Sequence, residues 1–287
     1  IAISASHNPN EWNALKLLNS TGQFMSPSEN KKMLEKLDES QNKYSGWNAL
    51  GKLTMYEEGL KKHMNDVMKM QFIDLEKIRS KKFRVLVDCV NGAGVYVIPE
   101  LLRNFGCEVI EMNCERTGIF PRLPEPLPEN LTDTMKAVTE SKADFGVVVD
   151  PDVDRLAIIQ EDGDMFGEEY TLVAVADFML QHKKGNTVSN LSSTRALRDI
   201  TEKANCKYHA SAVGEVNVVE KMKEVKAIIG GEGNGGVIVP ELHYGRDALA
   251  GIALFLSGLA KSGKSCSMYR AQFPDYFISK NKIELSP

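Results

Sequence analysis

The 287-residue sequence lacks the features that mark membrane, secreted or nucleic-acid-binding proteins. It contains no apolar run of about 18–20 residues and no segment that resembles a signal peptide. Its five cysteines form no CxxC pair and are odd in number, which is typical of reduced thiols in a cytoplasmic protein. The 35 basic and 39 acidic residues leave a net charge of −4, so the composition indicates no binding to nucleic acid or to a membrane.

What the sequence does contain is the alternation of strands and helices that is typical of α/β domains. A hydrophobic content of 43% and a charged content of 26% suit a globular protein, and the length allows two or three domains. We expect strands at residues 83–87, 107–112, 145–149, 156–159, 187–191, 207–211, 225–229 and 237–239. Helices are expected at about 94–104, 131–141, 194–204, 215–224 and 247–261.

The N-terminal part is predicted to contain less regular structure. Residues 1–3 and 14–18 are expected to be short strands. Ser26-Pro27-Ser28-Glu29 has the pattern of a capping box and predicts a helix start. Apolar spacing then predicts one inward face on this helix and another on a helix over residues 55–70. The residues expected on these faces are Met33, Leu34 and Leu37, and Leu60, Met64, Val67 and Met68.

The segment Asp150-Pro151-Asp152-Val153-Asp154-Arg155 lies between two strongly apolar runs that resemble buried strands. Three carboxylates this close together repel one another unless a cation neutralises them. Oxygen ligands alone suit a hard ion such as Mg²⁺ or Ca²⁺ better than zinc. The alternative is a solvated acidic turn between two strands.

An EF-hand calcium loop is the first rival for this segment. Asp150, Asp152, Asp154 and Glu161 occupy its positions 1, 3, 5 and 12. Position 6, where that loop needs glycine, is Arg155, and the flanking residues favour strands over helices. We therefore reject the EF-hand.

Two phosphate-binding patterns are also rejected. The GxGxxG pattern at residues 231–236 is followed by a predicted strand that ends in proline, whereas a dinucleotide site needs a helix there. Residues 258–265 match the Walker A pattern, but a helix that ends at Gly263 and a new helix that starts at Ser265 explain the same letters.

A polar turn near the N-terminus, Ser4-Ala5-Ser6-His7-Asn8-Pro9, offers a different chemistry. A serine hydroxyl is a weak nucleophile and needs a base or a metal ion to activate it. No GxSxG motif or Ser-His-Asp order indicates a hydrolase triad. Phosphoryl transfer makes better use of a serine, a metal site and a lysine such as Lys16.

Three motifs together resemble the α-D-phosphohexomutase family, in the family's order and over nearly the whole chain. The serine turn, with Asn13 and Lys16, resembles the family's active-site serine loop. Residues 150–155 resemble its magnesium loop, and Gly231-Glu232-Gly233-Asn234-Gly235-Gly236 is similar to its sugar-recognition loop. The segment 120–131, with four prolines, resembles its proline-rich loop. Asn234 and Gly236 depart from the family's usual serine and histidine.

The resemblance implies a role for each matching residue. Ser6 would carry the phosphoryl group, and its phosphate oxygen would share Mg²⁺ with the three aspartates. His7 and Arg155 would contact the phosphate, while Lys16 would be the acid/base. The implied sites are therefore Ser6, His7, Lys16 and Arg155 for catalysis; Ser6, Asp150, Asp152 and Asp154 for the metal; and Glu232 and Asn234 for the substrate.

The resemblance also implies the fold and the reaction. We expect successive mixed-sheet α/β domains of the phosphohexomutase type, in a fragment that lacks the start of domain 1 and all of domain 4. The expected limits are 1–73, 74–178 and 179–274 for domains 1 to 3, followed by a linker over 275–287. Such a fragment is expected to show little or no turnover alone.

The implied reaction moves phosphate between the 1- and 6-positions of a sugar phosphate through a bisphosphate. Glucosamine phosphate is the first expectation, with mannose and glucose phosphates as alternatives. A metal-dependent phosphatase and a non-catalytic sugar-phosphate-binding fragment are alternatives of other classes. The sequence does not predict the oligomeric state.

Overall fold

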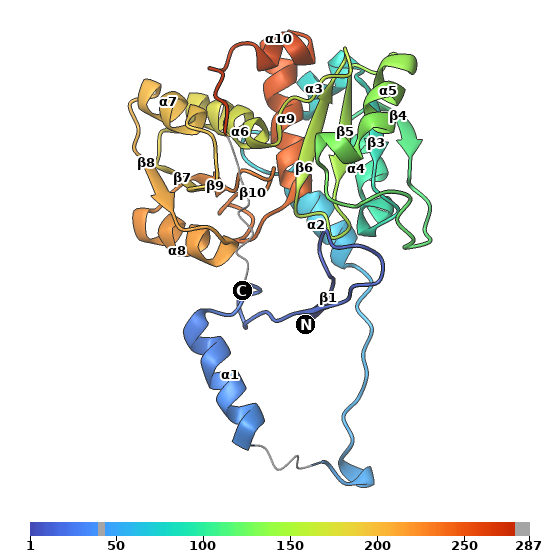
Figure 1. Ribbon diagram of the computed structural model, residues 1–287, viewed down its shortest axis with the longest axis vertical. Coiled ribbons are helices and arrows are strands. Elements are labelled where there is room, and N and C mark those ends of the chain that lie inside the picture. Colours follow the sequence, from blue (N-terminus) through green and yellow to red (C-terminus); the bar gives the residue numbers. More distant parts are fainter. Residues whose placement is uncertain (40–43, 279–287) are drawn as a thin grey trace, which may run out of the picture.

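The computed structural model describes residues 1–39 and 44–278. Two α/β bodies lie side by side, and the N-terminal segment lies below them (Figure 1). This segment contains a two-stranded antiparallel sheet of β1 (Ala2–Ile3) and β2 (Leu15–Lys16) and the helix α1 (Pro27–Glu39). The expectation of successive α/β units with mixed sheets is confirmed.

The first body is built on a four-stranded mixed sheet with the order β4-β3-β5-β6. Strand β3 runs parallel to β4 and to β5, whereas β6 is antiparallel to β5. All four strands start and end within one residue of the predicted limits. Their bounds are Arg84–Asp88 (β3), Glu108–Met112 (β4), Phe145–Val149 (β5) and Leu156–Gln160 (β6), and the helices between them are α4 (Ile98–Asn104) and α5 (Thr132–Glu140).

The second body contains a mixed sheet with the order β10-β9-β7-β8. The strands are Thr187–Asn190 (β7), Tyr208–Ser211 (β8), Ile229–Gly231 (β9) and Val237–Ile238 (β10), and the helices are α7 (Ala196–Lys203) and α8 (Glu215–Val225). The predicted strand at 225–229 is wrong, because α8 continues to Val225. It ends where Lys226 adopts a left-handed conformation, and the strand starts only at Ile229.

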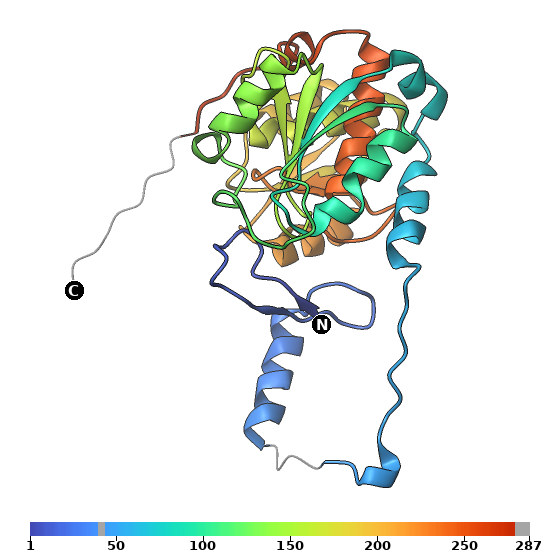
Figure 2. The ribbon, with the colours of Figure 1, turned by 90° about the vertical axis from the view of Figure 1, so that its right-hand side faces the viewer.

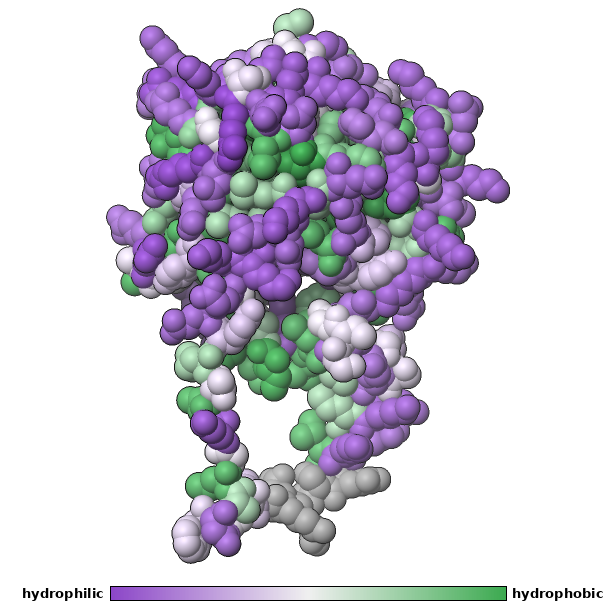
Figure 3. Space-filling view, turned by 180° about the vertical axis from the view of Figure 1, so that it is seen from behind, coloured by the Kyte–Doolittle hydropathy of each residue, from purple (hydrophilic) through white to green (hydrophobic). Residues whose placement is uncertain are grey.

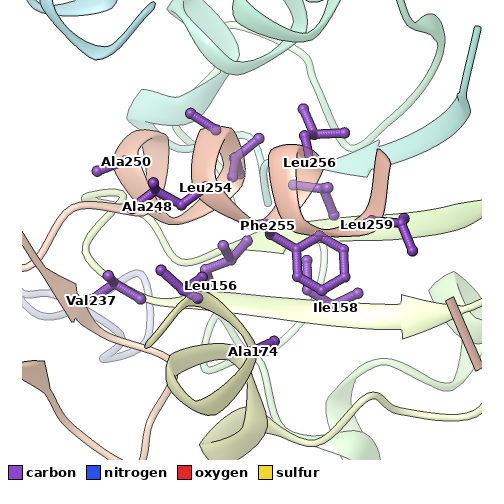
Figure 4. Close-up of a cluster of buried hydrophobic side chains, with 14 of the residues drawn as sticks. Leu156, Ile158, Ala174, Val237, Ala248, Ala250, Leu254, Phe255, Leu256 and Leu259 are labelled. Atoms are coloured by element: carbon purple, nitrogen blue, oxygen red, sulfur yellow. The ribbon is translucent and has the colours of Figure 1, made fainter. Parts of the chain in front are cut away.

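Helices α6 (Glu168–His182) and α9 (Ala248–Ser262) lie between the two sheets and join the bodies (Figure 1). Every residue of α9 from Ala248 to Ala260 is buried, as expected for a helix that is apolar all round. Figure 4 shows Phe255 directed from α9 toward Ile158 on β6. The sequence pattern did not predict α6, because its buried residues lie on all sides and leave little 3.6-residue periodicity.

Both rejected phosphate motifs have the structures predicted for them. The GxGxxG segment is the hairpin between β9 and β10, in which the Glu232 amide donates to the Gly236 carbonyl over 3.0 Å. The Walker-like segment ends α9, with Gly263 in the left-handed conformation. Ser265 then caps the short helix α10 (Cys266–Arg270).

The N-terminal helices agree only in part with the predictions. The capping box is confirmed, because the Ser26 amide donates to Glu29 Oε2 over 2.7 Å and the Glu29 amide donates to Ser26 Oγ over 3.3 Å. The inward face predicted for α1 is wrong: Leu34 and Leu37 are 50% and 62% exposed. Helix α1 lies apart from the two bodies and therefore does not pack on their core (Figure 2).

Helix α2 (Gly59–Met68) begins four residues later than predicted, and α3 (Leu75–Lys81) was not predicted. Met64 and Val67 are buried as expected, but Leu60 is 54% exposed, so that part of the predicted inward face is wrong.

The surface of the N-terminal segment is unusually apolar. Ile3, Trp12, Trp47 and Leu53 are between 62% and 87% exposed, and hydrophobic residues are visible on this lower part in Figure 3.

The predicted linker over 275–287 lies mostly outside the described residues. Among the residues that are described, no helix has both the length and the apolar composition needed to cross a membrane.

Phe255 provides a test of the core between the two bodies. Its ring contacts Phe145 and Phe166 edge-on, with centroids 5.8 and 5.2 Å apart. We expect Phe255→Ala to lower the free energy of unfolding by about 3–5 kcal/mol, because it leaves a cavity in a close-packed core. Met268→Ala on α10, where the side chain is 60% exposed, should change it by less than about 0.5 kcal/mol. Denaturant unfolding measures both, and equal effects would contradict this packing.

Candidate active site

The acidic segment forms the tight connection between the antiparallel strands β5 and β6. Asp150 Oδ1 accepts the backbone amides of Asp154 and Arg155, each over 3.0 Å, and these bonds fold the loop around the buried Asp150 side chain. Val153 has a φ of 64°, a strained conformation for a β-branched residue. The loop is thus held in a defined shape at the carboxyl ends of the parallel strands.

Three carboxylate oxygens in this loop are buried without a hydrogen-bond partner among the described residues: Asp150 Oδ2, Asp152 Oδ1 and Asp154 Oδ1. One oxygen from each of the three aspartates lies within 4.8 Å of the others. A buried acceptor left unpaired costs about 1–3 kcal/mol, and more if it is charged. Three hard anionic oxygens that converge in this way fit a divalent cation of the Mg²⁺ or Ca²⁺ type.

Other groups bind the remaining oxygens of Asp152 and Asp154. Asp152 Oδ2 accepts the Ser4 hydroxyl over 2.8 Å and also a hydrogen bond from the Lys16 ammonium. Asp154 Oδ2 accepts Arg246 over 2.7 Å and lies 3.4 Å from Lys16 Nζ. These contacts leave the three unpartnered oxygens available to a cation.

Burial and charge perturb the acidity of the cluster. Burial raises the pKa of Asp150 well above its usual range, and repulsion from Asp154 and Asp152 adds to the effect. Burial would also raise the pKa of Asp152, but the hydrogen bond and charge of Lys16 hold it below its ordinary value. Burial would lower the pKa of Lys16, but the hydrogen bond to Asp152 and the nearby carboxylates raise it. Lys16 is therefore an ammonium cation in this arrangement.

A turn after β3 supports the acidic loop from behind. Val90 and Asn91 both have positive φ angles, and Ala93 donates its amide to the Pro151 carbonyl over 2.8 Å. A Cβ atom at Gly92 would lie only 2.6 Å from the Cα of Pro151, so only glycine fits this contact. The close approach fixes the position of the aspartates.

The serine loop lies beside the acidic loop. Ser6 has a φ of 55° and donates its amide to Ser4 Oγ over 2.9 Å, and its own Oγ lies 3.1 Å from His7 Nδ1. Both Ser6 and Asp152 line a pocket of about 400 Å³. In this structure Ser4, and not Ser6, makes the direct contact with an aspartate.

Arg155 and His7 lie in contact, with Arg155 Nη2 3.3 Å from His7 Nε2. Burial and the charge of Arg155 lower the pKa of His7. Sequence reasoning missed their shared partner, Glu125, which accepts Arg155 over 2.6 Å and lies 3.8 Å from His7. Its position in the proline-rich loop was the available signal.

The proline-rich loop is anchored from two sides. Buried Asp88, at the end of β3, pairs with Arg122 at 3.1 Å and accepts the Thr134 hydroxyl over 2.8 Å. On the other side, Asn10 of the serine loop accepts the Phe120 amide over 3.0 Å. The loop therefore joins the serine segment to the first sheet.

The glycine-rich hairpin is connected to the aspartates through Arg246. This guanidinium contacts Asp154 at 2.7 Å, Glu215 at 2.9 Å and Glu232 at 3.1 Å. Sequence reasoning missed Arg246 and Glu215, because neither lies in one of the motifs that the sequence analysis identified. Glu232 is 5% exposed and also accepts Asn190 over 2.8 Å.

The predicted site residues are therefore partly assembled. Lys16, Asp152 and Asp154 are in contact, and His7 contacts Arg155. The Asn234 side chain accepts the Gly236 amide over 3.2 Å within its own hairpin. Ser6 as a metal ligand, Glu232 and Asn234 as sugar ligands, and the catalytic roles stay predictions.

Profiles of known families match almost the whole chain. Phosphoglucomutase/phosphomannomutase α/β/α domains I, II and III match residues 1–44, 61–163 and 167–276. The chain belongs to the phosphoglucomutase/phosphomannomutase family.

Two similar relatives are archaeal proteins. A probable phosphoglucosamine mutase of Methanopyrus kandleri is 32% identical over 99% of this chain and 62% of its own length. A phosphoglucomutase/phosphomannomutase of Thermococcus kodakarensis is 37% identical over 98% of this chain and 61% of its own length. The chain thus spans about three fifths of the length of these family members.

Solved structures share the fold at lower identity. A putative phosphomannomutase from Thermus thermophilus superposes with a TM-score of 0.84 at 24% identity, over 94% of this chain and 61% of the other. The N-acetylphosphoglucosamine mutase of Aspergillus fumigatus, solved with GlcNAc-6P and magnesium, has a TM-score of 0.64 at 16% identity, over 95% of this chain and 72% of the other.

The unpartnered oxygens lead to a binding prediction. We expect the protein to bind one Mg²⁺, and Asp152→Asn to weaken binding more than tenfold, or about 1.4 kcal/mol, because it removes a ligand charge. Asp133→Asn, on the exposed side of α5, makes the same chemical change and should leave the affinity unchanged. Isothermal titration calorimetry measures all three proteins.

The Mg²⁺ affinity should also depend on pH. Mg²⁺ binding needs Asp150 in its ionised form. Because the pKa of Asp150 is raised, the Mg²⁺ affinity should begin to fall on acidification at a pH above about 3.9, the pKa of an ordinary aspartate. Equal Mg²⁺ affinity in wild type and Asp152→Asn would contradict this assignment.

Proposed function

We propose that this chain is the core of a phosphohexomutase, which moves a phosphoryl group between the 1- and 6-positions of a hexosamine or hexose phosphate. The observation that carries the proposal is the set of three unpartnered carboxylate oxygens next to the strained serine loop. The match to three domains of one mutase family supports it. The chain spans 61–62% of the length of these relatives.

Ser6 is the proposed phosphoryl carrier. Its backbone conformation and the Ser4 hydroxyl hold it at the pocket shared with Asp152. In the transfer to the sugar, the bond between Ser6 Oγ and phosphorus breaks as a sugar hydroxyl oxygen bonds to phosphorus. Lys16 would donate its proton to Ser6 Oγ, which ends as a neutral hydroxyl, and would take up the proton that the sugar hydroxyl loses. Reversal of these changes at the other sugar position reloads Ser6.

Lys16 is the proposed acid/base. Its ammonium bonds to Asp152 Oδ2, which also accepts the Ser4 hydroxyl, and Ser4 Oγ accepts the Ser6 amide, so three contacts link Lys16 to the backbone of Ser6. The carboxylates keep Lys16 protonated, so it begins as a proton donor. Arg155 and His7 would hold the phosphoryl oxygens, and Glu125 orients both side chains.

Mg²⁺ is the proposed cofactor, held by the three aspartates and by a phosphate oxygen on Ser6. Bound Mg²⁺ would neutralise negative charge on the phosphoryl group during transfer. The carboxylate set fits such an ion, and the similar Aspergillus fumigatus structure contains magnesium.

The proposed partner is a sugar phosphate, bound near Glu232 and Asn234 of the glycine-rich hairpin. The relatives have both phosphoglucosamine mutase and phosphoglucomutase/phosphomannomutase names. We therefore propose glucosamine phosphate first and glucose and mannose phosphates as alternatives. A side-by-side assay of the three phosphates ranks them.

The remaining sequence-based assignments also stand as proposals. We place the domain limits at 73/74 and 178/179, with domain 3 ending at 274, and the protein in the cytoplasm.

Phosphorylation of Ser6 tests the proposed function directly. We expect incubation with Mg²⁺ and glucose 1,6-bisphosphate to add one phosphoryl group to wild-type protein, because the chain supplies the carrier serine and the metal loop. Ser6→Ala should remain unlabelled, while Ser20→Ala, in an exposed turn, should be labelled normally. Intact-mass spectrometry followed by peptide mapping measures the label.

Product analysis separates this mechanism from the other classes. Sustained release of inorganic phosphate without a phosphorylated Ser6 would indicate a phosphatase, and binding without transfer would indicate a non-catalytic protein. Either result, or equal labelling of Ser6→Ala and wild type, would overturn the proposal.

A further inference from the structure

A second group of metal-ligating side chains lies outside the aspartate loop. It consists of His63 on α2 and His243 and Asp247 just before α9, and one ligand atom from each can lie within 4.8 Å of the others. His63 Nε2 is 2.8 Å and His243 Nε2 is 3.0 Å from Asp247 Oδ2. We propose that these three residues form a binding site for a borderline divalent cation, Zn²⁺ in the first place.

The donor set matches the chemistry of such an ion. Two imidazole nitrogens and one carboxylate oxygen are common Zn²⁺ ligands, and a water molecule completes the tetrahedron. Bonds of about 2.0–2.1 Å place tetrahedral ligands about 3.3 Å apart, close to the two distances observed here. The imidazoles make the site softer than the all-oxygen aspartate loop, so the two sites should select different ions.

The three ligands are held by two elements, α2 and the segment that leads into α9. Asp247 is 6% exposed, and its Oδ1 caps α9 by accepting the amides of Leu249 and Ala250, which leaves Oδ2 directed at the histidines. Neighbouring Met64 and Val67 of α2 are buried in the core, so the helix that carries His63 is fixed. The side chains of His63 and His243 are 33% and 43% exposed, which gives an ion and its water ligand access from solvent.

A metal ion here would clamp two parts of the molecule together. Helix α2 follows the segment that contains Ser6, while Asp247 directly follows Arg246, which contacts Asp154. The next residue, Ala248, donates its amide to the Val153 carbonyl of the aspartate loop over 3.1 Å. Binding would therefore stabilise the junction between α2 and the support of the aspartate loop without taking part in the chemistry.

Zn²⁺ titration in saturating Mg²⁺ tests the site, with Mg²⁺ blocking the aspartate loop. We expect wild type to bind one Zn²⁺ per chain. His63→Gln should weaken Zn²⁺ binding more than about 100-fold, because loss of a direct ligand costs more than the 10–100-fold typical of a residue that only hydrogen-bonds to a ligand. His182→Gln, which alters a histidine on α6 outside the cluster, should bind Zn²⁺ as wild type does. Bound Co²⁺ should show the intense visible absorption of four-coordinate cobalt only in wild type and His182→Gln.

A second variant distinguishes loss of a Zn²⁺ ligand from misfolding. Asp247→Asn keeps an oxygen for the helix cap but removes the ligand charge, so it should fold and still lose Zn²⁺. The absence of stoichiometric Zn²⁺ binding in wild type would overturn the proposal, as would wild-type Zn²⁺ affinity in His63→Gln and Asp247→Asn. Mg²⁺ binding and phosphorylation of Ser6 are measured separately, so failure of this site leaves the proposed function untouched.

Discussion

The convergence of three carboxylates at one loop, those of buried Asp150 and Asp154 and half-buried Asp152, is the constraint on which the rest of the site depends. Such a cluster is unfavourable by itself, because burial and repulsion both oppose its full ionisation. The structure holds it in place through a strained Val153, a glycine pressed against Pro151 and two amides bonded to Asp150. Lys16 and Arg246 then neutralise part of the charge and leave one oxygen of each aspartate free.

Because these cations come from different parts of the chain, the cluster also organises the molecule. Lys16 comes from the N-terminal segment, and Arg246 from the turn before α9, which is buried between the two sheets. The proline-rich loop adds a third connection, through Glu125 to Arg155 and His7. The pocket that Ser6 and Asp152 line lies where the serine loop, the turn after β3 and the aspartate loop meet.

Much of this arrangement could be predicted from sequence, because continuous apolar runs and helix-capping residues reflect local structure. The strands of the first sheet and the cap at Asp247 follow from such patterns. Helix α6 could not be found this way, since a helix buried on all sides has little periodicity. Glu125 and Arg246 were missed because pairing between distant loops leaves no local pattern. The inward face predicted for α1 failed because amphipathic spacing does not specify what covers it.

The central claim is that the aspartate loop is half of a metal site, which a phosphoryl group on Ser6 completes. Its most direct test is the Mg²⁺ affinity of one protein before and after phosphorylation of Ser6, with Ser6→Ala treated identically as the control. Phosphorylation adds about −1.5 to −2 charge and new oxygen ligands beside the aspartates, so affinity should rise at least about tenfold in wild type only. Equal affinities before and after phosphorylation would contradict a shared site.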